Sequence, residues 1–205
     1  MTDYFALLHQ LRLPWIDDES LKSKFLELSA TVHPDRVHGA SEIEKRSSTQ
    51  RSAELNAAYN CLRDPKTRLQ HLLELEAGAK PKQVEQISPG TMELFLKIGQ
   101  LCREVDGFLA ERNRVTSPVM KVELFERAQE WTDKLQHVRR DLTNQERILT
   151  AELKQLNAAW EGAPASGLAR ASALPLAELE RIWRDFSYLG RWTGQIQERI
   201  VQLSF

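Results

Sequence analysis

His33, Pro34 and Asp35 are the residues of this chain whose types and spacing best suit chemistry or recognition. The imidazole can donate, accept or carry a proton, and the carboxylate two residues later is an acceptor. The proline between them locks its own φ and lacks an N–H, so both side chains are expected to project from a rigid turn. Such a turn suits docking to a polar surface of another protein, a general base with its orienting carboxylate, or a metal site that includes His38.

Docking is the favoured interpretation, and no enzyme activity, metal or cofactor is predicted. A catalytic pair usually lies in a pocket built from several elements, whereas these groups come from one loop. No Gly-rich phosphate loop, nucleophile motif or paired carboxylate set accompanies them. Three exposed polar residues on a loop are a simpler interpretation than a metal site. The other histidines, His9, His71 and His137, are isolated on helical patterns and are expected to be surface or satisfied core residues.

Helical patterns flank this turn on both sides. Leu21, Phe25, Leu28 and Val32 are spaced by four, three and four residues, which places them on one face of a helix that Pro34 ends. Ser20 is a candidate N-cap for that helix. The inward face of the following helix is expected to carry Ala53, Leu55, Ala58, Tyr59 and Leu62. The helices predicted for the N-terminal part are Tyr4 to about Leu11, about Ser20 to Val32, Glu42 to Arg63, and Lys66 to Glu76.

The remainder of the chain predicts a three-helix bundle after a linker. Residues 77–90 hold two glycines and two prolines with almost no apolar pattern, which is typical of a linker. Ser117 and Pro118 are predicted to be the N-cap and the first residue of a helix. Residues 162–173 are predicted to form a loop, and Pro175 to about Leu203 the last helix. The seam of the first bundle helix is expected to be formed by Phe95, Ile98, Cys102, Val105 and Leu109. The predicted fold class is therefore all-α, an N-terminal helical hairpin followed by a three-helix bundle.

Composition excludes several classes of protein. The 205 residues carry a formal net charge of −1, so the positive field that phosphate-backbone binding requires is absent and no nucleic-acid partner is predicted. No apolar run is long enough to cross a membrane, and the N-terminus does not resemble a signal peptide. Cys61 and Cys102 form no CxxC pair, so they are expected to be buried free thiols in a reducing cytoplasm.

Residues 3–76 resemble a J-domain. The resemblance rests on the order of helices around His33-Pro34-Asp35, on Leu55-Asn56-Ala57-Ala58-Tyr59, and on Leu62-Arg63-Asp64-Pro65. It implies docking to a DnaK-type heat-shock chaperone and stimulation of its ATP hydrolysis. The family usually has basic residues at the end of the helix before the turn, where this chain has Ser29, Ala30 and Thr31. The chaperone-binding residues that the resemblance implies are His33, Pro34, Asp35, Lys24, Arg36 and Asn56.

The whole chain resembles the HscB type of J-protein, which presents an IscU-like iron–sulfur scaffold to an HscA-type chaperone. Arg68 with Leu72-Leu73, and Phe186, Tyr188 and Leu189 of the last helix, look like that family's sequence. The resemblance implies a J-domain over residues 1–76, a linker over 77–90 and a client-binding domain over 91–205. Two alternatives stay open: a helical adaptor with an inactive J-like domain, or a J-protein with a different client. The client-binding residues implied are Leu96, Glu104 and Tyr188, where Tyr188 stands for a phenylalanine of the family.

Overall fold

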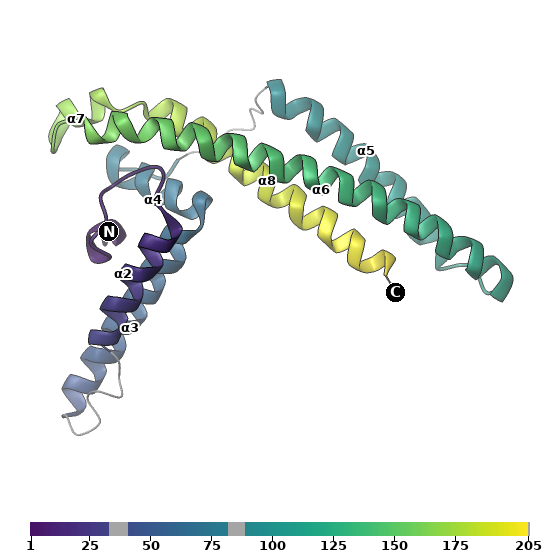
Figure 1. Ribbon diagram of the computed structural model, residues 1–205, viewed down its shortest axis with the longest axis horizontal. Helices are drawn as coiled ribbons and strands as arrows, with labels where there is room; N and C mark the ends of the chain where they lie inside the picture. Colours follow the sequence, from purple (N-terminus) through teal and green to yellow (C-terminus); the bar gives the residue numbers. More distant parts are fainter. Residues whose placement is uncertain (33–40, 82–88, 205) are drawn as a thin grey trace. The chain divides into compact units, whose positions relative to one another are not determined.

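A computed structural model describes residues 1–32, 41–81 and 89–204 of the chain. These residues form helices joined by turns and contain no strand, so the predicted all-α fold class is confirmed for them (Figure 1). In chain order the helices are α1 (Tyr4–Leu7), α2 (Asp18–Thr31), α3 (Glu42–Arg63), α4 (Pro65–Ala77), α5 (Pro89–Arg112), α6 (Pro118–Glu161), α7 (Gly167–Ala173) and α8 (Leu176–Leu203).

Side-chain caps set where the N-terminal helices begin. The predicted cap of α2, Ser20, is wrong: Asp17 is the N-cap, and its carboxylate accepts the Ser20 backbone N–H at 2.9 Å. An aspartate accepts that bond while its charge also favours the helix N-terminus, so the helix begins earlier than the apolar stripe indicates. Asp64 caps α4 by accepting the Thr67 N–H at 2.8 Å, and Pro65 occupies the first helical position.

Two predicted segments differ from the structure. The first helix ends at Leu7 and not near Leu11, because His9 adopts a left-handed φ of 52° that a continuing helix does not allow. The predicted loop over residues 162–173 contains the helix α7. The alanines and the arginine of this segment are good helix formers, and they prevail over its glycine and serine content.

The described residues divide into two compact units. The first joins residues 1–81 to residues 151–183, and the second joins residues 89–150 to residues 184–204. The division falls inside α6 and α8, where the sequence has no breaker. The predicted domain boundaries at residues 76 and 90 stay a prediction.

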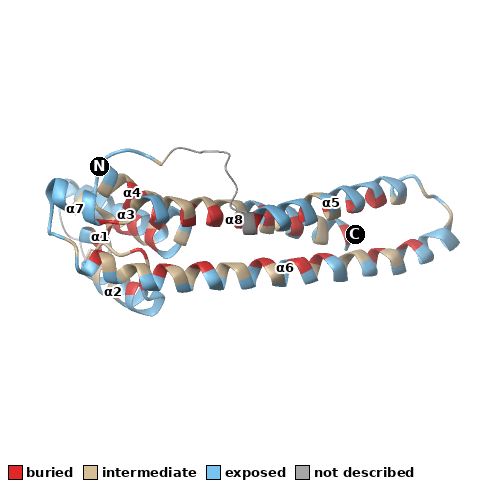
Figure 2. Ribbon diagram, turned by 90° about the horizontal axis from the view of Figure 1, so that it is seen from above, coloured by how far each residue is buried: buried red, intermediate tan, exposed pale blue. Residues whose placement is uncertain are grey.

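Each unit has its own apolar core, visible as the buried side of its helices in Figure 2. In the first unit α3 contacts α1, α2 and α4. Its fully buried side chains include Phe5, Leu8, Leu21, Ala58, Leu62, Leu69 and Leu72. In the second unit the buried residues recur at helical spacing on α5, α6 and α8, among them Ile98, Cys102, Val105, Leu135, Leu142, Leu189 and Ile196.

The predicted core faces contain two errors. Phe95 is 40% exposed, because its ring lies at the edge of the α5 seam, 5.9 Å from the Trp192 ring of α8. Ala53 is exposed on α3, whereas Ser48, five residues earlier, is buried. A small alanine tolerates either environment, so its place in an apolar stripe is a weak indication of burial.

Polar contacts join the helix ends of the second unit. The Arg112 guanidinium donates to the carbonyl oxygens of Gln202 and Leu203 at 2.8 and 3.2 Å, which satisfies carbonyls at the end of α8. Arg199 of α8 donates two hydrogen bonds to the Asp106 carboxylate of α5, at 2.7 and 2.9 Å. These bonds fix the pairing of α5 with α8.

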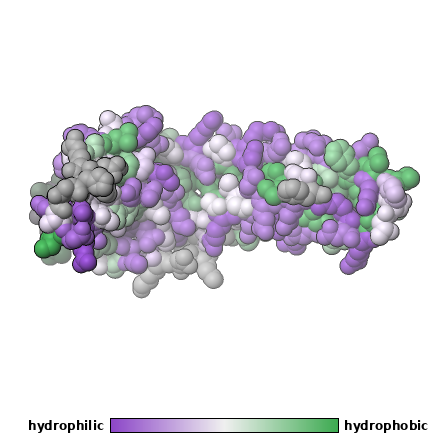
Figure 3. Space-filling model, turned by 90° about the horizontal axis from the view of Figure 1, so that it is seen from below, coloured by the Kyte–Doolittle hydropathy of each residue, from purple (hydrophilic) through white to green (hydrophobic). Residues whose placement is uncertain are grey.

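Exposed apolar side chains gather near the turn between α5 and α6. Val119, Met120, Val122 and Phe125 are each at least half exposed within the first turns of α6. Figure 3 shows apolar side chains gathered toward this part of the second unit. No helix among the described residues is both long enough and apolar enough to span a membrane.

Candidate functional site

The end of α2 is fixed to α3 immediately before the predicted docking turn. Ser48, buried on α3, donates its hydroxyl to the Val32 carbonyl oxygen at 2.7 Å. The Val32 N–H in turn donates to the Ser29 carbonyl oxygen. His33, Pro34, Asp35 and Arg36, with His38, lie outside the described residues. The chain therefore enters the turn from a position held by hydrogen bonds.

The other flank of the turn is held by a capping box at the start of α3. The Glu44 carboxylate accepts the Ser41 N–H at 2.8 Å, and the Ser41 hydroxyl accepts the Glu44 N–H at 3.3 Å. The hydrogen bond from the Ser41 backbone, and then that from its side chain, hold the pKa of Glu44 below its ordinary value. Both ends of the segment that contains His33 and Asp35 are thus anchored to the helical hairpin.

Aromatic stacking stiffens the hairpin between α2 and α3. The rings of Phe25 and Tyr59 are nearly parallel, with centroids 4.3 Å apart, and the Arg63 guanidinium lies 5.7 Å from the Tyr59 centroid. Such contacts add to the burial of the rings themselves. The stacked rings therefore hold α2 and α3 together in the described part of the hairpin.

The two other described chaperone-binding candidates, Lys24 and Asn56, already have local partners. Lys24 donates to the Glu27 carboxylate at 2.8 Å, one turn further along α2, and this bond lowers the pKa of Glu27. Asn56 is exposed on α3, and its amide nitrogen donates to the Ser52 carbonyl oxygen at 2.8 Å. The last turn of α2 carries no basic side chain, so the positive charge that this helix offers a partner is small.

A buried arginine ties the loop before α2 to the junction of α3 and α4. Arg68 is 2% exposed, and it donates to the Pro14 and Leu62 carbonyl oxygens at 3.0 and 2.7 Å. Burial lowers the pKa of Arg68 to about 10. Arg68 belongs to the sequence segment that resembles HscB, and its hydrogen bonds give that segment a structural role.

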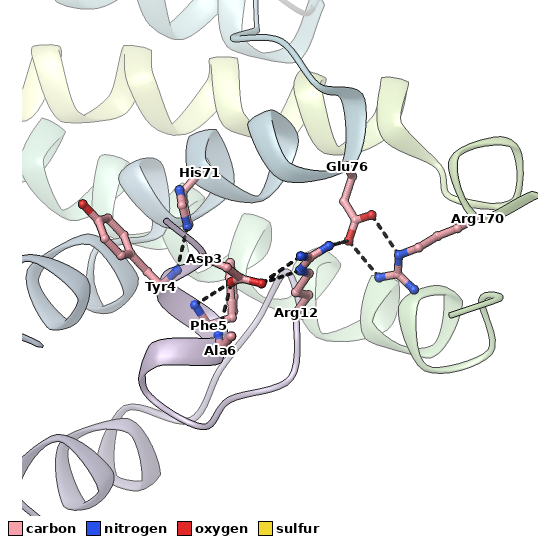
Figure 4. A network of polar contacts seen from close by, with 8 residues as sticks. All are labelled: Asp3, Tyr4, Phe5, Ala6, Arg12, His71, Glu76 and Arg170. Atoms are coloured by element: carbon pink, nitrogen blue, oxygen red, sulfur yellow. Dashed lines mark hydrogen bonds and ion pairs between the residues drawn. The ribbon is translucent and has the colours of Figure 1, made fainter. Parts of the chain in front are cut away.

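A second polar network, drawn in Figure 4, joins the N-terminus to α4 and α7. Asp3 caps α1 and accepts the Arg12 Nε–H at 2.9 Å. Arg12 also lies 3.9 Å from the Glu76 carboxylate at the end of α4. The same carboxylate, 3% exposed, accepts two hydrogen bonds of 2.8 Å from Arg170 of α7. Sequence reasoning missed this network, because its charged residues lie in segments far apart in the chain.

The end of α6 is bound to the same unit through a paired amide. The Asn157 side chain accepts the Trp15 N–H and donates to the Trp15 carbonyl oxygen, both at 2.9 Å. The Lys154 ammonium lies 4.3 Å from the centroid of the Trp15 ring. The loop between α1 and α2 therefore rests on α6 through both its backbone and its side chain.

The predicted client-binding residues come from two helices, Leu96 and Glu104 from α5 and Tyr188 from α8. Leu96 is 62% exposed. Tyr188 of α8 stacks against Trp192, with centroids 5.7 Å apart, and Trp192 lies against Phe95. The Arg191 guanidinium lies 4.8 Å from the Tyr188 centroid. This side of α5 and α8 is an aromatic row with a cationic edge.

Glu104 lines a groove of about 510 Å³ that α5 shares with α6. Its carboxylate accepts a hydrogen bond of 2.9 Å from Gln100. The groove has an apolar floor of Leu101 and Val138, and Leu96 and Tyr188 do not contribute to its lining. Of the three predicted client residues, Glu104 lines this groove, and the role of all three in client binding stays a prediction.

His71 and the two cysteines lie wholly or partly within the helical packing. The buried His71 accepts the Tyr4 N–H at 3.1 Å, and burial lowers its pKa. Burial likewise raises the pKa of Cys61 to about 11 and raises that of Cys102. No group of three His, Cys, Asp or Glu side chains suited to a metal ion occurs in residues 1–32, 41–81 and 89–204. The expectation of a satisfied core histidine is confirmed for His71.

This chain is similar to HscB proteins in sequence and, separately, in fold. No protein-family model matches it. A co-chaperone protein HscB homolog of Shewanella pealeana is 40% identical over 74 residues, which are 36% of this chain and 42% of the relative. This chain thus spans about two-fifths of the length of the curated relatives it matches.

Two solved structures share the fold over nearly the whole chain. Chaperone HscB from Vibrio cholerae has a TM-score of 0.54 at 22% identity, and covers 98% of this chain and 99% of its own. The crystal structure of human co-chaperone protein HscB has a TM-score of 0.61 at 20% identity, and covers 97% of this chain and 82% of its own. The resemblance to HscB co-chaperones that the sequence indicates is confirmed, and so is the fold class.

Proposed function

We propose that this protein is a co-chaperone of the HscB type, which activates a DnaK- or HscA-type chaperone and brings it an iron–sulfur scaffold as client. The observation that carries the proposal is the hairpin of α2 and α3, anchored on both flanks of the segment that contains His33, Pro34 and Asp35. The similarity to HscB homologues in sequence supports it. The protein would act without chemistry of its own, as a regulator of its partner's ATP hydrolysis.

The chaperone would be recognised by the turn and by the nearby polar side chains. The Asp35 carboxylate can accept a bidentate pair of hydrogen bonds from an arginine of the partner, and His33 offers a donor and an acceptor. Pro34 would hold both in place, so little conformational entropy is lost on binding. Lys24, Arg36 and Asn56 would border this contact.

The client would be bound by the second unit. The exposed Leu96 and the Tyr188–Trp192 row offer apolar and aromatic contacts, and Glu104 offers a charge on the adjacent groove. Protein interfaces commonly combine an aromatic core with a charged rim. We therefore expect the scaffold to contact both α5 and α8.

The test of the chaperone arm is steady-state ATP hydrolysis by a DnaK- or HscA-type chaperone with the full chain added. The wild type should stimulate hydrolysis, and Asp35→Asn should lose most of the stimulation, because the amide keeps the size of the side chain but lacks its charge. Asp133→Asn, at an exposed aspartate of α6, is the matched control and should stimulate like the wild type. Equal stimulation by wild type and Asp35→Asn would remove the proposed role of the turn.

The test of the client arm is calorimetric titration of the full chain with an IscU-like scaffold. Leu96→Ser and Tyr188→Ala should each weaken binding about tenfold or more, as truncation of a central interface side chain commonly does. Ile148→Ser, at an exposed apolar residue of α6, should leave the affinity unchanged. No heat at scaffold concentrations well into the micromolar range would point to a different client.

One observation favours a second function, a helical adaptor whose J-like part is inactive. The end of α2 lacks basic side chains and Lys24 is paired with Glu27, so electrostatic attraction to a chaperone is weak. The ATPase assay distinguishes the two functions, because an adaptor would give no stimulation with either wild type or Asp35→Asn. The cytoplasmic location stays a prediction.

A further inference from the structure

The ends of α5, α6 and α8 in the second unit enclose a pocket of about 650 Å³. α8 ends at Leu203, while the first turns of α6 continue past it, so one side of α6 is left without a covering helix. The apolar wall is formed by Val115, Leu124, Phe125, Ala128 and Leu203. A pocket of this size accommodates several side chains of a bound segment.

A large exposed aromatic side chain lies at the mouth of this pocket. Phe125, which lines it, is 70% exposed, while Leu124 beside it is buried. The described residues of the second unit therefore leave most of the Phe125 side chain in water. Aromatic rings contribute strongly to binding when a partner buries them.

The charges at the pocket have one sign. Among the described lining residues, the charged ones are Arg112 and Lys121. Arg112 is held in place by the carbonyl oxygens at the end of α8, and none of the described lining residues is a carboxylate that would compensate its charge. The neighbouring Glu111 is occupied by Arg127, which donates two hydrogen bonds to it at 2.8 and 3.0 Å.

We infer that this pocket binds an acidic amphipathic segment of a partner protein. The segment's apolar side chains would fill the space beside Phe125 and Leu124, and its carboxylates would lie against Arg112 and Lys121. The inference goes beyond the proposed function, since Leu96, Glu104 and Tyr188 do not line this pocket. It would give the protein a further binding surface, separate from those for chaperone and scaffold.

Charge argues against two other occupants. A symmetric contact with a second copy would bring Arg112 and Lys121 of each copy toward the same cations of the other, which is repulsive. An anionic membrane surface would be repelled by the exposed Glu123 and Glu126. These two residues lie beside Val119 and Val122, on the side of α6 that faces away from the pocket. An acidic segment that enters from the pocket side avoids both conflicts.

The test is fluorescence anisotropy of a labelled probe peptide titrated with the full chain. The probe is an acetylated helical peptide with leucines on one face and glutamates flanking them, and its control has a lysine for each glutamate. The acidic probe should bind with a Kd on the order of 10 μM, and the basic probe at least tenfold more weakly. Phe125→Ser should raise the Kd of the acidic probe about tenfold or more. Ile148→Ser, which replaces an exposed residue of the same helix, should leave that Kd unchanged. Lys121→Glu, which brings the charge of the described lining from +2 to 0, should abolish the preference between the two probes.

Three results would overturn the inference. The first is equal binding of both probes, and the second is wild-type affinity in Phe125→Ser. The third is a protein that does not bind the acidic probe but self-associates or binds phosphatidylserine vesicles, with Phe125→Ser abolishing that association. Phe125 is largely exposed, so its replacement is expected to leave the helical circular dichroism unchanged and to isolate binding from folding.

Discussion

The ion pair between Glu76 and Arg170 should contribute to stability far more than a surface salt bridge does. The Glu76 side chain is 3% exposed and that of Arg170 13%, and two hydrogen bonds of 2.8 Å join them. Arg170→Ala leaves the buried carboxylate with Arg12 as its remaining cation, at 3.9 Å. Removing one partner of a fully buried pair costs about 3–5 kcal/mol, and exposed pairs contribute about 0–1 kcal/mol. This pair keeps some exposure and one spare cation, so we expect a loss of about 2–3 kcal/mol.

A double-mutant cycle in urea, followed by circular dichroism, measures this interaction. Arg170→Ala, Glu76→Ala and the double variant should give a coupling free energy of about 2 kcal/mol that changes little in about 1 M salt, because a buried pair is poorly screened. Lys45 and Glu42, which are 41% and 79% exposed, form the matched control pair. Their coupling should be at most about 0.5 kcal/mol and should vanish in salt. A coupling at Glu76–Arg170 as small and as salt-sensitive as that of the control would refute the reasoning.

Three further predictions concern the first unit. Protonation of His71 removes the acceptor for the Tyr4 N–H, and its pKa is lowered in the fold, so stability should fall as pH drops below the ordinary value of 6.5. Urea unfolding of wild type and His71→Gln across pH tests this, since only the wild type should show the slope. Ser48→Ala should cost about 1–2 kcal/mol in the same assay, because the Val32 carbonyl loses its donor; no loss would contradict the proposed anchor. Cys61, with a pKa of about 11, should react with iodoacetamide near pH 8 much more slowly than glutathione, measured in a Cys102→Ala background. An equal rate would mean that the thiol is not shielded as described.

Local signals in the sequence predicted the elements of the first unit well. The bounds of α3 agree with the prediction, because Ser41 with Glu44 and Asp64 with Pro65 are start and stop signals that act within four residues. The start of α2 was misplaced because two residue types compete for the N-cap position and the apolar stripe does not distinguish them. Signals of this kind reach no further than a helical turn.

Contacts across the chain could not be predicted in that way. The hydrogen bonds between Arg170 and Glu76 span 94 residues, and those between Asn157 and Trp15 span 142. Nothing local marks these side chains as partners, and the segment that holds Arg170 reads as a loop. The sequence therefore indicated α2, α3 and α4 of the first unit, but neither α7 nor the polar network that joins the unit's distant segments.

The candidate client residues illustrate a limit of resemblance. Leu96 and Glu104 are eight residues apart on α5, which turns them by about 80° from one another on the helix surface. That spacing keeps both on one broad face of the helix, yet Glu104 lines the groove beside α6 and Leu96 does not. A resemblance carried over residue by residue does not show whether the residues still form one surface.

The central claim is that one protein chain couples a chaperone-activating turn to a client-binding surface. It is tested most directly by ATP hydrolysis of the DnaK- or HscA-type chaperone with this protein and the IscU-like scaffold present together. The account predicts that the two proteins stimulate hydrolysis more than the sum of their separate effects, and that Asp35→Asn and Tyr188→Ala each abolish the excess. Stimulation that is merely additive, or an excess that survives both substitutions, would contradict it.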